Sequence, residues 1–251
     1  DLRDSSVTLE DLFGNEEELL TLSEMQQDAE EEEDLEDRTE WPIRYGERKS
    51  LDRIRDDPPQ FLEKLETGVK NGDCLLACFA VLLECLSKGC VAAVKKKAVA
   101  AKMRSTMIKY IKSKWNEYPV FNPYMKVHDL ITLTHDVPEE REGESWGDTS
   151  VNRLRAYERV CGGLYFSDVE MLLFSSMMHE KGIEIVFRTW RWIPNEKRSI
   201  FISCTPECES LRENGVTEAY VIDLEHSGTN DGSSAHYKLI EGGSLVGLLE
   251  V

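Results

Sequence analysis

Most of the negative charge of this chain lies in one short segment, and this restricts where a folded core can form. Residues 1–40 contain 17 acidic and two basic side chains, a net charge of −15, whereas the other 211 residues carry only −3. Few apolar residues in 1–40 are available to offset the conformational entropy lost on folding. We therefore expect an acidic segment at 1–40, disordered or docked on a partner, and one globular domain at 41–251.

The composition also excludes several classes of protein. No apolar run approaches the roughly 18 residues of a membrane helix, and no signal-peptide pattern is visible. The net charge of −18 makes nucleic acid an unfavourable partner. Seven cysteines without an Asn-x-Ser/Thr sequon favour a reducing compartment. We expect a cytoplasmic protein, or one in the host cytosol if the source is a virus or an intracellular pathogen. Because the chain begins at Asp1, we expect a fragment or a processed product.

Hydrophobic spacing predicts helices first and strands afterwards. We expect helices within 16–27, over 60–69, over the apolar stretch Cys74–Leu86, over the basic stretch 91–116, and from a capping box at Ser167 to about His179. After a polar loop at 136–150, strand patterns occur at 183–190, 199–204, 219–224 and 236–240. This order indicates an α+β protein whose helical N-terminal part packs on a small, mainly antiparallel sheet.

The turn Asn71-Gly72-Asp73 places Cys74 at the start of a buried helix. A helix N-terminus lowers the pKa of a thiol, and its unpaired amides point at the space where an oxyanion would develop. Gly72 would allow a substrate to approach the backbone closely. Cys74 is therefore a candidate nucleophile, although an ordinary buried cysteine would fit this stretch too.

Among the five histidines, His236 has the most informative context. It opens the last predicted strand and directly follows the flexible sequence Gly232-Ser233-Ser234-Ala235. An imidazole at a sheet edge is held by the strand and is reachable from the loop, as a general base requires. A surface histidine at the end of a strand is the simpler interpretation.

The remaining cysteines suggest no cofactor site. Cys78 and Cys85 lie inside the apolar helix, where packing is the expected role. Cys204 and Cys208 are close in sequence, but no second Cys/His pair with zinc-like spacing follows them. We therefore expect neither a metal nor another cofactor.

Three motifs in order resemble those of the ovarian-tumour (OTU) family of papain-like cysteine proteases. The segment 71–79 is similar to that family's nucleophile motif, Asp-Gly-Asn-Cys-Leu-Phe. Residues 157–186, with Cys161-Gly162-Gly163, an acidic-apolar helix and a strand, resemble its middle block, and Ala235-His236-Tyr237 resembles its terminal His-Tyr. The resemblance covers about residues 60–241.

This resemblance implies an OTU-like fold and a deubiquitinase, which hydrolyses the isopeptide or peptide bond after the C-terminal glycine of ubiquitin or a ubiquitin-like modifier. Carried over to this chain, Cys74 is the nucleophile, His236 is the general base, and Tyr237 packs beside the histidine. The backbone amides of Gly72, Asp73 and Cys74 would form the oxyanion hole.

The third catalytic group departs from the family pattern. An Asn or Asp often stands two residues after the histidine, but Lys238 occupies that position and cannot accept a hydrogen bond from an imidazole. Asn71, Asp231 and Glu241 are alternative acceptors. A catalytically dead ubiquitin-binding module and another papain-like peptidase, for example of the bacteriocin-leader type, therefore stay open as alternatives.

The charged segments suggest an interaction of their own. The acidic block 30–37 and the basic face of 95–114 are opposite in sign and would attract each other at low salt. The acidic segment would then restrain the catalytic domain. The alternative is that an acidic partner or a membrane surface binds the basic face.

Overall fold

The computed structural model describes residues 48–54, 64–65, 73–88, 96–135, 149–193, 198–227 and 236–240. The expected acidic segment at 1–40, its short helix at 16–27, and most of the expected loop at 136–150 lie outside the described residues. In the described ranges no helix is both long and apolar enough to cross a membrane.

The sheet is mixed, and the chain belongs to the α+β class. Its strands are β1 (Lys49–Ser50), β2 (Lys64–Leu65), β3 (Ile185–Ile193), β4 (Arg198–Thr205), β5 (Glu218–Ser227) and β6 (His236–Ile240). They lie in the order β2-β6-β5-β3-β4, and β1 pairs with β5. All pairs are antiparallel except β3 and β5, which run parallel. A parallel pair requires a crossover connection, and here that connection consists of β4 and the helix that follows it.

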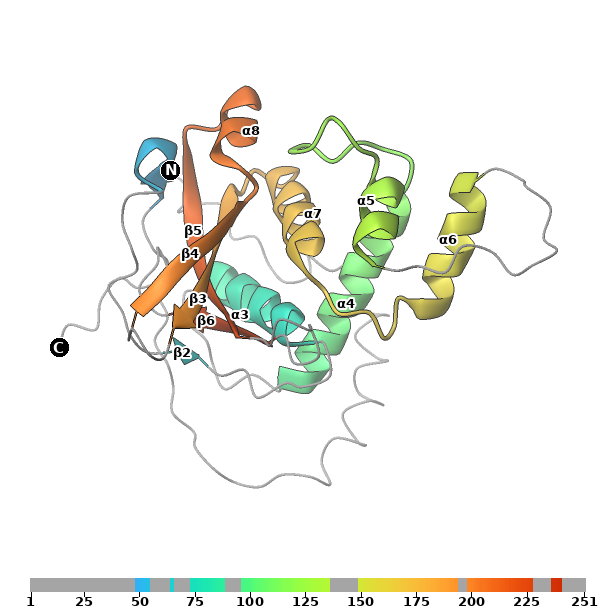
Figure 1. Cartoon of the computed structure of the whole chain (residues 1–251), viewed down its shortest axis with the longest axis horizontal. Coiled ribbons are helices and arrows are strands. Elements are labelled where there is room, and N and C mark those ends of the chain that lie inside the picture. The colour runs from blue at the N-terminus through green and yellow to red at the C-terminus, as the bar shows by residue number, and fades with distance from the viewer. Residues whose placement is uncertain are drawn as a thin grey trace, which may run out of the picture.

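Most of the helices lie on one side of this sheet (Figure 1), but the turn at 51–53 and the helix at 208–213 pack in a second core with Val186, Ala219 and Val221 of the sheet. They are α3 (Cys74–Lys88), α4 (Lys96–Ser113), α5 (Val127–Thr134), α6 (Thr149–Val160), α7 (Asp168–His179) and α8 (Cys208–Glu213), with a 3-10 turn, η2, at Leu51–Arg53. Helix α3 contacts both β6 and α4, and α7 contacts both β3 and α4. Helix α3 is therefore enclosed between the sheet and another helix, as its continuous apolar sequence predicts.

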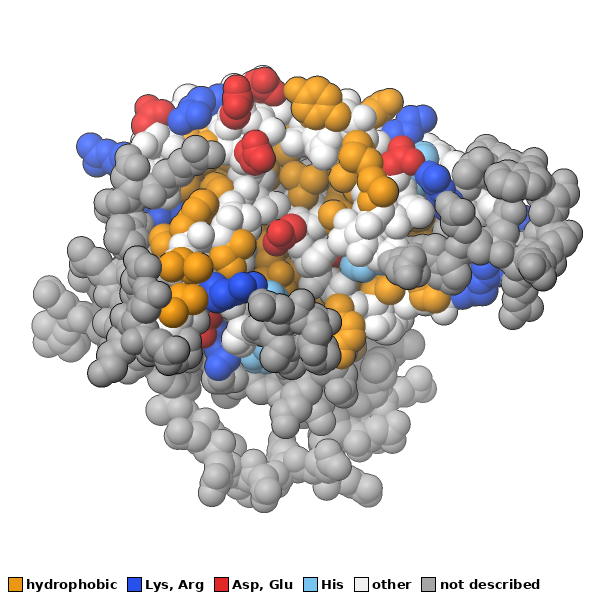
Figure 2. All heavy atoms as spheres, viewed as in Figure 1, with side chains coloured by type: hydrophobic (Ala, Val, Ile, Leu, Met, Phe, Trp, Pro, Cys, Tyr) orange, Lys and Arg blue, Asp and Glu red, His pale blue; other side chains and the backbone are white. Residues whose placement is uncertain are grey.

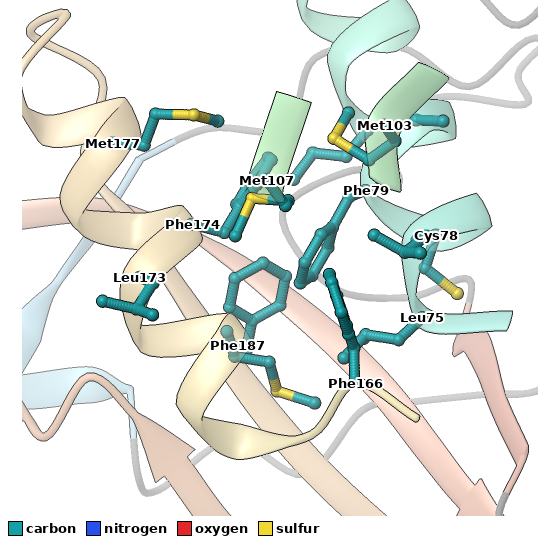
Figure 3. Packing of buried hydrophobic residues seen from close by; sticks show 14 of the residues in the cluster. Leu75, Cys78, Phe79, Met103, Met107, Phe166, Leu173, Phe174, Met177 and Phe187 are labelled. Atoms are coloured by element: carbon teal, nitrogen blue, oxygen red, sulfur yellow. The ribbon is translucent and has the colours of Figure 1, made fainter. Parts of the chain in front are cut away.

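Aromatic side chains fill the main core between α3, α7 and the sheet. Phe79 of α3 stacks on Phe174 of α7 with ring centroids 4.2 Å apart, and it lies 5.3 Å from the ring of Phe187 in β3. All three side chains are almost completely buried (Figure 3). These contacts fix α3 against the sheet and so determine where the first turn of α3 lies.

A buried ion pair joins the two parallel strands. Arg188 and Asp223 face each other in the register of β3 and β5, and their two hydrogen bonds are both 2.7 Å long. Asp223 also accepts a hydrogen bond from the indole of Trp190, and Arg188 donates one to the carbonyl of Ile54. Because each charge has several partners, the network offsets the cost of burying the two ions.

The prediction of a helix over 60–69 is wrong at Lys64 and Leu65. These residues form β2 and pair antiparallel with Ile240 and Leu239 of β6. The apolar spacing is compatible with a helix, but the unpaired edge of β6 offers backbone hydrogen bonds to this segment. A long-range partner of this kind is not visible in local spacing.

Strand β4 is the other edge of the sheet and carries exposed apolar side chains. Phe201 and Ile202 are both 42% exposed, and the ring of Phe201 also packs edge-on against Trp190. Hydrophobic side chains are visible on the side of the molecule where β4 lies (Figure 2). Basic and acidic side chains are interspersed over the face that this figure shows.

Helix α7 begins as its sequence predicts. Ser167 and Glu170 form a capping box, in which the Glu170 carboxylate accepts hydrogen bonds from the amide of Ser167, at 2.7 Å, and from its hydroxyl, at 3.2 Å. Glu170 is buried and also lies 2.6 Å from the ring of His135. The cap therefore connects α7 to the end of α5.

We expect Ser167→Ala to lower the free energy of unfolding by about 1 kcal/mol, the usual effect of removing an N-cap side chain. The midpoint of thermal unfolding should fall by about 2–4 °C for a chain of this size. Ser113→Ala is a matched control, because Ser113 is exposed at the end of α4. An unchanged midpoint for Ser167→Ala would show that the capping box does not stabilise α7.

Candidate active site

Cys74 is the first residue of α3, as the turn before it predicts. The amide of Ala77 donates a 2.8 Å hydrogen bond to the carbonyl of Asp73, so Asp73 stands at the N-cap position. Only 4% of Cys74 is exposed. Asn71 and Gly72, which the sequence assigns to a third catalytic group and to the oxyanion hole, lie outside the described residues.

Strand β6 lies against this first helical turn. The amide nitrogen of Tyr237 is 3.4 Å from Sγ of Cys74, and Sγ of Cys78 lies 3.9 Å from the Tyr237 carbonyl oxygen. His236 directly precedes that amide, so covalent geometry places its Cα within about 6 Å of the Cys74 sulfur. Residues 162 apart in the sequence are thus neighbours in the fold.

The surroundings of Cys74 act on its thiol in opposite directions. Burial is the largest effect and raises the pKa of Cys74, and the nearby carboxylate of Asp73 raises it further. Backbone amides of Tyr237, Leu75 and Cys74 point at the sulfur and lower the pKa. The amides stabilise a negative sulfur once it forms, but the raised pKa means that a base is needed to remove the proton at neutral pH.

Cys78, one turn further along α3, is a packing residue as predicted. Its side chain is 1% exposed. Burial raises the pKa of Cys78 well above its ordinary range, and the charge of Cys74 raises it further. Cys74 and Cys78 lie in the same helix, but only Cys74 lies at its N-terminus, where the amides of the first turn point at the sulfur.

Arg104 is the residue of this site that sequence reasoning misses. The sequence assigns it to the basic outer face of α4, but only 9% of it is exposed. Its guanidinium donates to the Asp73 carboxylate at 2.8 Å, with a second nitrogen 2.6 Å away, and to the carbonyl of Cys161 at 2.9 Å. The same group lies 4.8 Å from the ring centre of Phe166.

The helical spacing of α4 contains the signal that would have identified Arg104. Ala100, Met103, Met107 and Ile111 are all buried, and Arg104 falls on the stripe that they form. A charged residue on an apolar stripe needs a partner in the interior. Lys109 and Lys112 of this helix are exposed. Lys112 pairs with Glu158, and Lys114, directly after the helix, pairs with Glu117 and Glu180.

A second histidine lies near β6, which the sequence did not indicate. His226 of β5 faces Tyr237 across the sheet, and their ring centres are 4.9 Å apart. Burial lowers the pKa of His226, the charge of Arg191 lowers it further, and Asp168 opposes both. Burial raises the pKa of Asp168, and His226 opposes that shift. Both shifts favour the uncharged forms, although Asp168 is exposed and His226 is half-buried at the rim of the core.

Asn71, Asp231 and Glu241 are the acceptors that the sequence suggests for His236. Asp231 and Glu241, like Asn71, lie outside the described residues. Lys238 follows on the same side of β6 and pairs in register with Glu225 of β5. The position that often holds the third catalytic residue in the OTU pattern is therefore occupied by a cation beside an acid.

The two cysteines at the end of β4 and the start of α8 lie close together. Sγ of Cys204 and Sγ of Cys208 are 3.9 Å apart. Throughout the described ranges, no group of three or more His, Cys, Asp or Glu side chains is arranged to hold a metal ion.

Comparisons with protein-family models, with curated proteins and with solved structures give no match to this chain. The interpretation of the site therefore rests on its geometry and on the three sequence motifs.

Proposed function

We propose that this chain is a thiol-dependent deubiquitinase that hydrolyses the bond after the C-terminal glycine of ubiquitin or a ubiquitin-like modifier. One observation carries the proposal: the Cys74 sulfur, at the N-terminus of α3, lies 3.4 Å from the amide next to His236. A thiol at a helix N-terminus with an imidazole on a neighbouring strand is the arrangement that papain-like chemistry needs. The three ordered motifs direct the proposal to ubiquitin.

In the proposed reaction, His236 accepts the proton of Cys74, and the thiolate attacks the carbonyl carbon of the C-terminal glycine. Backbone amides at the start of α3 stabilise the oxyanion, and those of Asp73 and Cys74 belong to the described part of this turn. Imidazolium then protonates the leaving amine as the C–N bond breaks, which leaves a thioester. Water, deprotonated by His236, hydrolyses the thioester and restores the thiol. We propose the cytosol as the compartment, because this chemistry needs a reduced cysteine.

An electrophilic ubiquitin probe tests the proposal directly. The full chain should form a covalent adduct with the probe, peptide mass spectrometry should place that adduct on Cys74, and the chain should cleave di-ubiquitin. Binding of ubiquitin without an adduct and without cleavage would instead indicate a catalytically dead module. Cleavage of unmodified peptides without any dependence on ubiquitin would indicate another papain-like peptidase.

A further inference from the structure

Arg104 joins three segments that meet at the start of α3. Its guanidinium pairs with Asp73, directly before Cys74, and donates to the carbonyl of Cys161, just beyond the end of α6. Its plane also lies over the ring of Phe166, just before α7. One side chain from α4 therefore fixes Asp73, the N-cap residue of α3, relative to the segment that connects α6 and α7.

The partner of Arg104 has an electrostatic effect on the proposed nucleophile. Asp73 is the acidic neighbour of Cys74, and its side chain is only 30% exposed, so water screens it incompletely. A carboxylate in that position disfavours a thiolate next to it, because like charges repel. A cation that pairs with the carboxylate reduces this repulsion.

We infer that Arg104 is a positioning residue for Cys74: it pairs with Asp73 and holds this N-cap residue in the place that directs the start of α3 at β6. The inference rests on the proposed function in one respect, since it takes Cys74 to be the reacting thiol. It extends that function by assigning a role to a helix whose basic residues the sequence places on the outside. Arg104 does not itself touch the reacting atoms.

Among the described residues, the other titratable and charged groups near Cys74 come from α3 and β6. Cys78 lies one turn further along α3, and β6 contributes His236, the phenol of Tyr237 and Lys238. The charges of Tyr237 and Cys78 interact with Cys74, but both groups are buried and have strongly raised pKa values, so they are neutral near pH 7. Asp73 is thus the nearest negative charge among the described groups that bears on the pKa of Cys74.

The test is the pH dependence of Cys74 alkylation by iodoacetamide, followed by mass spectrometry of the peptide that contains Cys74. Arg104→Gln should raise the pKa of Cys74 by about one unit and slow alkylation near pH 7 about tenfold, because Asp73 is left unpaired. Asp73→Asn should lower that pKa. The double variant Asp73→Asn/Arg104→Gln should return it to near the wild-type value.

A purely structural role for Arg104 predicts different results. In that case the double variant, which lacks the Arg104 contacts just as Arg104→Gln does, would show the same slow alkylation of Cys74 as Arg104→Gln. Lys112→Gln is the matched control, since it removes the same charge from the same helix at an exposed position paired with Glu158. It should leave the pKa of Cys74 unchanged. Circular dichroism at the assay temperature establishes which variants are folded.

Three outcomes would overturn the inference: an unchanged pKa in Arg104→Gln, a double variant as slow as Arg104→Gln, or an Asp73→Asn variant whose pKa does not fall. If Arg104→Gln does not fold, the pKa of Cys74 in Asp73→Asn, compared with wild type, still tests the inference. Alkylation needs no ubiquitin, so the role of Arg104 and the proposed deubiquitinase activity are tested by independent measurements. Wild-type protein that cleaves di-ubiquitin while these pKa values stay constant contradicts only the inference. The expected pKa shifts without any ubiquitin cleavage contradict only the proposed function.

Discussion

Replacement of Cys74 by alanine should abolish both cleavage of di-ubiquitin and labelling by an electrophilic ubiquitin probe. The substitution removes the sulfur that attacks the carbonyl carbon in the proposed reaction, so turnover should fall by at least about 10⁴-fold, as for other catalytic nucleophiles. The fold should persist, because the change removes one sulfur atom at the end of a helix. The measurements are gel assays of cleavage and of probe adducts, with circular dichroism to verify folding.

Cys78→Ala is the matched control for this experiment. Cys78 lies in the same helix and is equally buried, and its sulfur contacts the carbonyl of Tyr237 rather than the amide. We expect this variant to lose about 1 kcal/mol of stability through the small cavity and to keep its activity within a few-fold. Cleavage that survives in Cys74→Ala but disappears in Cys78→Ala would mean that the nucleophile is assigned to the wrong cysteine.

Replacement of His236 by alanine should reduce turnover near pH 7 by about 10²–10⁴-fold, the usual contribution of a general base. Burial raises the pKa of Cys74 in this structure, so without a base the thiol stays protonated at neutral pH. The loss of activity in His236→Ala should become smaller as the pH rises. As the pH rises toward the pKa of Cys74, the thiolate forms without help, and the ratio of wild-type to variant labelling rate should shrink.

His226→Gln is the control for that experiment. His226 is the other imidazole near β6, and its ring packs against Tyr237. The variant should label and cleave within a few-fold of wild type. A large loss in His226→Gln together with full activity in His236→Ala would transfer the role of base to His226. A constant ratio across the pH range would contradict the role of His236 in proton transfer.

Local patterns predicted the elements that depend on local information. The apolar stretch from Cys74 buries every side, and the Ser167 capping box starts α7 at Asp168. The four strands after Ile183 also occur close to their expected bounds. Each has an apolar or capping pattern within its own residues, which is why the sequence alone located them.

Elements that depend on distant partners were not predictable in the same way. Strand β2 exists because the edge of β6 is available to Lys64 and Leu65, and the parallel pairing of β3 with β5 depends on a crossover. Helices α5, α6 and α8 are short or lack a continuous apolar pattern. Their existence depends on packing, which spacing alone does not reveal.

The candidate site also combines residues that local patterns predict with contacts that depend on distant parts of the chain. Cys74 was predictable because a turn signal and a helix start are local, and His236 because it opens a strand after a flexible stretch. Their proximity depends on the packing of α3 against β6, which no local pattern contains. Arg104 was missed because its partner Asp73 lies 31 residues away in the chain.

The place of β6 in the sheet has a consequence for the time at which activity can begin during biosynthesis. At about 5–20 residues per second, a ribosome needs roughly 8–30 seconds to proceed from Cys74 to His236. During that interval the proposed nucleophile exists without the proposed base, and the apolar surface of α3 lacks the strand that packs on it. The same strand therefore completes the main core and supplies the proposed base, so a chain that has not reached His236 lacks one member of the proposed catalytic pair.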